Sequence, residues 1–423
     1  MSAGTDHITL LSNRTYFASL FEAVGAAREE LLAETYIFRF DRTGTEFVRL
    51  ATEAVRRGVR VRMLVDALGS PELMGEGERR IREAGIELVV YNRTGRLPLR
   101  TLHDRMHRKL IVVDRRVAFV GGLNIADEYA GLDVPGSFYD LAARIQGPIA
   151  ADAADRADEL IMLARSSAVR RAWREIRRFR STPLSSTGVM NRIVARDNHA
   201  RRNTIEREYV QAIRGARRSI LMAHAYFLPS HRLLKTLCAA SRRGVEVRVV
   251  LQGRAEHTVL RAAQWHLYHR MLRAGVRVYE YQRHYLHAKV MTVDGRWSTI
   301  GSSNLEPWSL TSNHELNLIS ACPSLARDLE EEIEPRLETE CTRIDPSRLG
   351  WFARLTSALS YELVLWVFVV TGGRSTRLWR TPPRSDRSRR DRSSDAAAVA
   401  RRSVAVNPPD PARPRSADAD DHA

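Results

Sequence analysis

The chain has 423 residues, of which 44% are apolar and 28% charged, enough for two or three folded domains and too apolar for a disordered polymer. Its three cysteines contain no CxxC pair, which excludes a disulfide scaffold and a cysteine zinc cluster. The formal net charge of +17 implies an anionic partner: a nucleic acid, a phospholipid surface or a phosphate-bearing substrate.

An internal repeat is the most informative feature of the chain. Three segments of the first half recur in the same order in the second half: residues 27–33 at 216–222, 56–65 at 242–251, and 84–88 at 274–278. We interpret each copy as a helix, a glycine stop and a short β-branched strand, the alternation typical of a layered α/β domain. The repeat therefore predicts two similar α/β domains, which we place at residues 8–164 and 191–345.

Near the end of each half stands the same pattern of polar residues. The first copy is His107-x-Lys109-x4-Asp114-x6-Gly121-Gly122-x-Asn124, and the second is His287-x-Lys289-x4-Asp294-x6-Gly301-Ser302-x-Asn304. The two copies contain two of the three lysines of a chain with 64 arginines, which indicates a role that a guanidinium does not fill. Chance is a poor explanation for two such patterns with equal spacing.

Each copy predicts a buried strand, a hairpin turn and a second strand. The first strands are Leu110–Val113 and Val290–Val293, and the second are Val117–Val120 and Trp297–Ile300. On a strand, residues i and i+2 share a face, so each histidine and its lysine point the same way. Asn124 and Asn304 then lie just past the neighbouring strand, close to the same end of the sheet.

Each half thus supplies one imidazole, one ammonium and one amide. If the halves meet across a two-fold-like interface, the two imidazoles face each other among hydrogen-bond donors. Such a site suits a phosphoryl group without a metal, because cations and amides neutralise the non-bridging oxygens. One histidine can attack phosphorus while the other protonates the leaving oxygen.

Each imidazole also needs a carboxylate that fixes its tautomer. Asp140 and Glu315 occupy matching strand positions after the two motifs, and we assign them this orienting role. Asp114 and Asp294 complete the candidate catalytic set. Their position at turn ends is equally typical of residues that cap a turn or a strand.

The other histidines give weaker signals. His103 precedes His107 by four residues and His284 precedes His287 by three, but neither pair has a third ligand at useful spacing and the nearby lysines would repel a cation, so we expect no metal. His224 either lines the pocket or, as is more common, is hydrogen-bonded in the core. The sequence has no GxSxG, Walker A or GxGxxG motif, so we expect no serine nucleophile and no nucleotide cofactor.

Three segments lie outside the two domains. Residues 165–190 contain arginines opposite apolar residues at helical spacing, which fits a solvated surface helix or a basic amphipathic helix on an anionic membrane. Residues 346–380 contain an apolar stretch that is too short to span a bilayer, so we expect an interfacial or re-entrant hairpin segment, with a buried C-terminal helix as the alternative. Residues 381–423 are predicted to be a disordered basic tail.

The duplicated motif resembles that of the phospholipase D superfamily. The stretches MHRKLIVVDRRVAFVGGLN, IQGP, AYFLP and HAKVMTVDGRWSTIGSSNLEPWSL are similar to its bacterial cardiolipin synthase branch, in particular to the B type, over residues 8–345. The resemblance implies two phospholipase D-like α/β domains, each a mixed sheet flanked by helices, related by a pseudo-two-fold axis with the active site at their interface. Gly122 departs from the pattern, which has serine there, and this puts in doubt a hydroxyl contact in that half.

The resemblance further implies cardiolipin synthesis without a cofactor or metal. One histidine displaces glycerol from phosphatidylglycerol, and the terminal hydroxyl of a second phosphatidylglycerol attacks the resulting phosphatidyl-histidine. The usual family assignment makes His107 the nucleophile and His287 the general acid and then base. The phosphate oxygens would be held by the lysines and asparagines of the motifs: Lys109, Lys289, Asn124 and Asn304.

The resemblance and the composition together give an expected location. Residues 1–16 lack the basic and then apolar stretches of a secretory signal. We expect peripheral or interfacial attachment to the inner membrane on the cytoplasmic side. The implied partners are phosphatidylglycerol and an anionic membrane surface, with no nucleic acid.

Other activities fit part of the same pattern. The motifs do not separate the synthase from a phospholipase D-type hydrolase or from a phosphatidyltransferase with another donor, such as phosphatidylethanolamine. A superfamily nuclease fits the charge, but it predicts aromatic and basic stretches for single-stranded nucleic acid rather than an apolar segment at residues 355–370. A non-enzymatic membrane scaffold is disfavoured because both half-sites are complete in the sequence.

Overall fold

The computed structural model describes residues 6–93, 104–131, 136–165, 190–198, 201–254, 258–345 and 351–370. The chain divides into two units, Met1–Trp379 and Arg380–Ala423, and every described residue belongs to the first. Residues 166–189 of the segment predicted to form a basic helix, the tail predicted at 381–423 and His103 lie outside the described residues.

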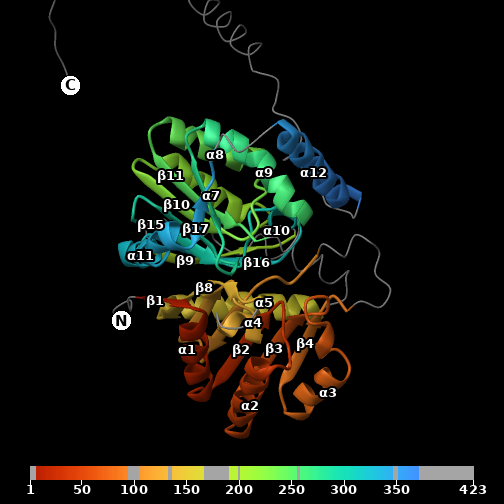
Figure 1. The fold of residues 1–423 in the computed structure, drawn as a ribbon. Helices are drawn as coiled ribbons and strands as arrows, with labels where there is room; N and C mark the ends of the chain where they lie inside the picture. Colours follow the sequence, from red (N-terminus) through yellow and green to blue (C-terminus); the bar gives the residue numbers. More distant parts are fainter. Residues whose placement is uncertain are drawn as a thin grey trace, which may run out of the picture. The chain divides into compact units, whose positions relative to one another are not determined.

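The first half contains a seven-stranded sheet in the order β1-β8-β6-β5-β2-β3-β4 (Figure 1). Its strands are β1 (His7–Ser12), β2 (Glu30–Thr35), β3 (Arg60–Asp66), β4 (Glu87–Tyr91), β5 (Leu110–Val113), β6 (Val117–Gly121) and β8 (Leu141–Gln146). The pairs β2–β3 and β3–β4 are parallel, and all other neighbours are antiparallel. The sheet is therefore mixed, as the family resemblance implies.

The second half repeats this arrangement with one additional edge strand, in the order β17-β12-β11-β10-β14-β15-β16-β9. Its strands are β9 (Asn191–Arg196), β10 (Ser219–His224), β11 (Glu246–Gln252), β12 (Arg277–Tyr281), β14 (Lys289–Val293), β15 (Trp297–Gly301), β16 (Glu315–Ser320) and β17 (Cys341–Arg343). Its register also matches the first half, since Leu31 pairs with Val61 where Ile220 pairs with Val247. The predicted fold class is confirmed.

Helices flank both sheets. They are α1 (Asn13–Gly25), α2 (Arg42–Arg56), η1 (Pro71–Leu73), α3 (Glu76–Glu83), α4 (Asp127–Ala130), α5 (Pro148–Arg165), α7 (Thr204–Gly215), α8 (His231–Arg242), α9 (Thr258–Arg273), α10 (Pro307–Thr311) and α11 (Pro323–Thr339). Just after α2 and α8 come Gly58 and Gly244 with φ of 89° and 93°, a conformation that glycine adopts without the cost of a Cβ. These are the glycine stops that the repeat predicts.

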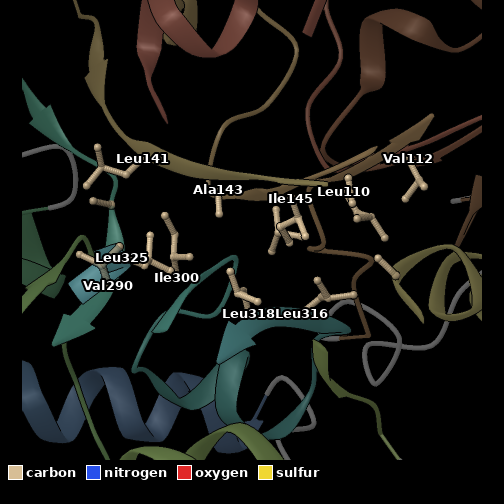
Figure 2. Close-up of a cluster of buried hydrophobic side chains, with 14 of the residues drawn as sticks. Leu110, Val112, Leu141, Ala143, Ile145, Val290, Ile300, Leu316, Leu318 and Leu325 are labelled. Carbon is tan, nitrogen blue, oxygen red and sulfur yellow. The ribbon is translucent and has the colours of Figure 1, made fainter. Parts of the chain in front are cut away.

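The two halves share one hydrophobic core, to which strands of both sheets and the helices α5 and α11 contribute. Figure 2 shows Leu141, Ala143 and Ile145 of β8 on one side of this core and side chains of the second half, such as Ile300 and Leu318, on the other. Each of these five residues exposes 1% or less of its surface. Because apolar burial of this kind is the dominant favourable term in folding, the shared core fixes the two halves against each other.

Residues 351–370 form one continuous helix, α12 (Trp351–Val370), which packs along α9 (Figure 1). The re-entrant hairpin is therefore wrong for these residues, since no turn interrupts the helix. Val364 and Leu365 are buried whereas Leu363 and Trp366 are about half exposed, at 48% and 56%, so α12 is also not a wholly buried helix. In the described part of the chain, no helix combines the length and the apolar character that crossing a bilayer requires.

Candidate active site

The two motif histidines contact carboxylates of the opposite half. Nδ1 of His107 lies 2.9 Å from Oε1 of Glu315, and Nδ1 of His287 lies 2.5 Å from Oδ2 of Asp140. The sequence assigned both carboxylates an orienting role, and the structure adds that each one crosses between the domains. Because Nδ1 of each ring is occupied, Nε2 is the atom left for chemistry.

Short backbone pairings between the halves bring these partners together. The backbone N–H of His107 donates to the carbonyl of His314 at 3.0 Å. In the equivalent position, β13 (Tyr285–Leu286) pairs in parallel with β7 (Phe138–Tyr139), and the N–H of His287 donates to the last carbonyl of β7 at 2.8 Å. Each motif histidine is therefore anchored by the same segment that supplies its carboxylate.

Each motif lysine folds back onto its own histidine. Lys109 Nζ donates to the carbonyl oxygen of His107 at 2.8 Å, and Lys289 Nζ donates to that of His287. Burial lowers the pKa of Lys109 to about 7; Glu315 opposes this shift and the charge of Lys289 adds to it. A compact ammonium can donate to the carbonyl oxygen two residues before it, whereas a planar guanidinium does not fit there. This accounts for lysine at these positions of an arginine-rich chain.

The motif asparagines lie beyond β6 and β15, at the sheet end where the histidines precede β5 and β14. Asn124 Oδ1 accepts a hydrogen bond from the N–H of Ile37 at 3.0 Å, which orients the amide and leaves its NH2 group as a donor. Asn304 is 5% exposed, and its Oδ1 has no hydrogen-bond partner in the described part of the chain. The NH2 group of Asn124 is thus oriented as a donor for an incoming anion.

The two carboxylates are held differently. Ser302 Oγ donates to Glu315 Oε2 at 2.5 Å. The matching residue in the first half is Gly122, and a Cβ added there would lie only 2.4–2.5 Å from the oxygens of Asp140. Asp140 therefore occupies the space that a serine side chain would need, and it accepts a hydrogen bond from the N–H of Leu141 at 2.8 Å instead. The first half therefore combines Gly122 with Asp140, where the second half combines Ser302 with Glu315. This paired difference explains why Gly122 departs from the superfamily pattern.

These surroundings give the carboxylates different charges. Burial raises the pKa of Asp140 to about 7, although Lys289 and Lys109 oppose the shift. Burial also acts to raise the pKa of Glu315, but His107 and Lys109 hold it below its ordinary value. At neutral pH Glu315 is therefore fully ionised, whereas Asp140 is only partly ionised.

The imidazoles are neutral at neutral pH. Burial lowers the pKa of His107, and Glu315 offsets only part of that shift. Burial, together with the charges of Lys289 and Lys109, lowers the pKa of His287 well below its ordinary value. The histidines and lysines of both motifs affect one another's pKa, so they form one site, and that site favours an anion.

Asp114 and Asp294 lie apart from the motif histidines, and their contacts favour the alternative that they cap turns. They occupy the turns after β5 and β14, at the strand ends opposite the histidines. The carboxylate of Asp114 accepts hydrogen bonds from the N–H groups of residues 28–30, and that of Asp294 from those of residues 217–219. Both residues have a positive φ, 52° and 56°, which aspartate tolerates in hairpin turns. Their role is to fix these turns.

Aromatic rings that the sequence did not single out flank both imidazoles. Tyr36 lies edge-on to His107 with 5.1 Å between ring centroids, and Tyr129 and Phe138 lie edge-on to His287, each at 5.3 Å. No motif marks these residues, because an aromatic residue beside a strand is usually part of the core. They place apolar surface around a polar centre.

His224 belongs to the core. It is fully buried, and its Nε2 lies 3.3 Å from the hydroxyl of Tyr209. Burial, with a contribution from Lys289, lowers its pKa to about 3. Among the described residues, no group of three or more histidine, cysteine or acidic side chains is arranged to hold a metal ion.

Both halves match one family model, described as "Cardiolipin synthase, PLD-like domain", at residues 20–148 and 209–337. Cardiolipin synthase B of Escherichia coli strain K12 is 35% identical over 363 residues, which cover 84% of this chain and 87% of that protein. The cardiolipin synthase of Geobacillus kaustophilus is 32% identical over 343 residues, covering 78% and 67%. Among solved structures, phosphatidylserine synthase of Haemophilus influenzae has a TM-score of 0.68 at 13% identity over 86% of this chain and 95% of its own, which shows the shared fold.

Proposed function

This chain belongs to the cardiolipin synthase family of phospholipase D-like proteins, and from that premise we propose that it is a phosphatidyltransferase making cardiolipin and glycerol from two molecules of phosphatidylglycerol. The observation that carries the proposal is the crossed pairing of His107 with Glu315 and of His287 with Asp140. It leaves one Nε2 atom from each half for the two sides of a single phosphorus atom.

In the first step, Nε2 of His107 attacks the phosphorus of one phosphatidylglycerol. The P–N bond forms as the bond from phosphorus to the glycerol oxygen breaks, and Nε2–H of His287 gives its proton to that oxygen. The charge on the non-bridging oxygens is balanced by Lys109, Lys289 and the two motif amides. Glycerol leaves, and a phosphatidyl-histidine remains.

The electrostatics favour His107 as the nucleophile. A nucleophilic imidazole needs a proton on Nδ1 and a lone pair on Nε2, and the ionised Glu315 carboxylate holds the Nδ1 proton. His287 has the weaker partner in this respect, because Asp140 is only partly ionised. A bound phosphodiester adds a negative charge beside His287 and so raises its pKa, which supplies the proton when the substrate is in place.

In the second step, His287 acts as a base. It takes the proton from the terminal hydroxyl of a second phosphatidylglycerol, whose oxygen attacks phosphorus while the P–N bond to His107 breaks. Cardiolipin forms and both histidines return to their starting state. One phosphodiester is exchanged for another, so the overall free-energy change is small and no nucleotide is needed.

Water is the competing nucleophile in that second step. The side chains of His107 and His287 are only 13% and 9% exposed, and the rings of Tyr36, Tyr129 and Phe138 surround them. Apolar surroundings of this kind favour a lipid alcohol over water as the acceptor. We place the reaction at the cytoplasmic surface of the inner membrane, where its substrates lie.

The test is to incubate the purified protein with phosphatidylglycerol vesicles and to identify the lipid products by mass. We expect cardiolipin and glycerol in equal amounts, and neither product with the His107→Ala variant. Phosphatidic acid as the only new lipid, released together with glycerol, would make the protein a hydrolase. Release of ethanolamine from added phosphatidylethanolamine, with no reaction of phosphatidylglycerol alone, would reassign the donor.

A further inference from the structure

One face of α12 carries apolar side chains that are exposed. Leu359, Leu363, Trp366 and Val370 are 63%, 48%, 56% and 55% exposed. They follow one another at intervals of four, three and four residues, so they lie on one side of the helix. In the described part of the chain, α12 supplies six of the ten exposed large apolar side chains, so this face is a patch and not scattered apolar surface.

The opposite face of α12 is anchored in the protein. Val364 and Leu365 are buried in the core of the second half, and Phe368 is also fully buried. Tyr361 stacks on His266 of α9, with 4.9 Å between ring centroids. The orientation of the helix is therefore set by packing, and this packing directs the apolar patch outward.

Positive charge lies on α9, which packs against α12, and on α8, which neighbours α9. Neither α8 nor α9 contains an aspartate or glutamate, whereas Lys235 of α8 and Arg270 and Arg273 of α9 are exposed. Arg270 Nη2 lies 3.4 Å from Nδ1 of His231, which joins the two helices into one basic surface. α12 itself carries a single carboxylate, that of Glu362.

The buried face of α12 also reaches the loop of the second half-site. Phe368 packs edge-on against Trp308 of α10, with 5.4 Å between ring centroids. α10 begins three residues after Asn304, and its N-cap, Glu306, accepts hydrogen bonds from the N–H groups of Trp308 and Ser309. The packing of α12 therefore extends to a helix that begins three residues after Asn304.

From these observations we infer that α12 docks the protein on an anionic bilayer, with its apolar patch inserted at the interface and the cations of α8 and α9 on the lipid headgroups. The inference rests on the proposed function, which supplies a bilayer substrate. Charge complementarity selects this occupant: an apolar stripe near two helices that carry cations and no carboxylates suits anionic lipid, whereas a second copy of the same face would bring like charges together.

The test compares binding of three variants to vesicles by flotation. In the variant Leu363→Glu/Trp366→Glu, two carboxylates replace the centre of the patch, and we expect about 100-fold weaker binding to vesicles of phosphatidylglycerol and phosphatidylcholine. Lys235→Glu/Arg270→Glu should weaken binding to these vesicles about 10-fold and leave binding to pure phosphatidylcholine unchanged. Met162→Glu, which changes an exposed apolar residue of α5, is the matched control and should bind like the parent protein.

Equal thermal unfolding midpoints show that the variants are folded. Binding by Leu363→Glu/Trp366→Glu within threefold of the parent protein would overturn the inference. So would a parent dimer in lipid-free solution that this variant converts to monomers, because the patch would then be a self-interface. Turnover of short-chain phosphatidylglycerol dissolved as monomers tests the proposed function separately: if the parent protein makes no cardiolipin from it, the function fails while the vesicle result still decides the docking.

Discussion

The variant Glu315→Gln tests whether a carboxylate of one domain sets the tautomer of the histidine in the other. In the parent protein, the Nδ1 proton of His107 points at Glu315 Oε1, and Ser302 Oγ donates to Oε2. Ser302 Oγ accepts a hydrogen bond from the N–H of Leu316 at 3.0 Å, and its own proton favours residue 315 because Oε2 lies at 2.5 Å whereas the carbonyl oxygen of Leu316 lies at 3.4 Å. A glutamine therefore keeps its oxygen on Ser302 and turns its NH2 group toward His107.

This substitution should move the proton of His107 from Nδ1 to Nε2. The lone pair on Nε2 is then lost, and attack on phosphorus stops in most molecules. Removing the carboxylate that locks a catalytic imidazole costs about 10,000-fold in serine proteases. Because a minority of glutamine side chains can turn their oxygen to His107, we expect about 1,000-fold lower kcat/KM here, or about 4 kcal/mol of transition-state stabilisation.

The assay is the initial rate of cardiolipin formation from dissolved short-chain phosphatidylglycerol. Glu330→Gln is the matched control. Glu330 lies on α11 and accepts a hydrogen bond from Thr292 at 2.7 Å, and its glutamine variant should keep the activity of the parent protein. Adding Ser302→Ala to Glu315→Gln removes the group that holds the glutamine oxygen, and about tenfold of the activity should return. A kcat/KM for Glu315→Gln within tenfold of the parent value would refute the crossed pairing.

Three further predictions concern other parts of the site. The pKa of Lys109 near 7 predicts that kcat/KM falls as the pH rises above about 7, because loss of the ammonium charge weakens binding of a phosphate anion. The variant Lys109→Arg should have a lower maximal kcat/KM, and the pH of its decline should be higher by at least about one unit. A decline at an unchanged pH would contradict the assignment. Gly122→Ser should reduce kcat at least about 100-fold, because its Cβ displaces Asp140, while Gly215→Ser, where the Cβ meets no atom within 4 Å, should be neutral in the same assay. Asp294→Asn should lower the free energy of unfolding in urea by about 1–3 kcal/mol without changing the rate per folded molecule. Backbone hydrogen bonds outweigh burial and hold the pKa of Asp294 below its ordinary value, so this loss of stability should be present above pH ~4 and vanish as the pH falls below it. A loss of rate with unchanged stability would return Asp294 to the site.

The fold was predictable because the sequence contains the same α/β pattern in both halves. A single copy of a helix, glycine and strand pattern is weak evidence, but the repeated segments 27–33 and 216–222 lead into strands that begin at Glu30 and Ser219 and have the same pairing register in both sheets. The hairpins after Val113 and Val293 were also predictable, since aspartate at the turn and β-branched runs on either side are local signals.

The histidines and carboxylates of the site were predictable, but its aromatic rings and its connections were not. The motif pattern identifies His107 and His287, and the matching strand positions identify Asp140 and Glu315. Which carboxylate serves which imidazole depends on backbone pairing between segments about 150 to 200 residues apart in the sequence, as in His107 with His314. One signal was present: Gly122 stands where the second copy has Ser302, and the same two copies differ as aspartate and glutamate.

Other outcomes depend on tertiary contacts that no local pattern reports. Asp114 could be read as catalytic or as a turn residue until its hydrogen bonds to residues 28–30 were seen. The apolar stretch at residues 355–370 predicted a membrane-like segment, but its length and composition did not show that α9 would bury one side of it and leave the other exposed. Tyr36 carries no signal at all, because its place beside His107 follows from the strand order.

Transfer of the phosphatidyl group to His107 is the central claim, and one measurement addresses it directly. A phosphatidyl ester of p-nitrophenol has a leaving group that needs no proton, so the variant His287→Asn should release one equivalent of p-nitrophenol in a burst and stop. Peptide mass mapping should then find the phosphatidyl group on His107, and His107→Asn should give no burst. A burst from His107→Asn, with the adduct on His287, would contradict the account.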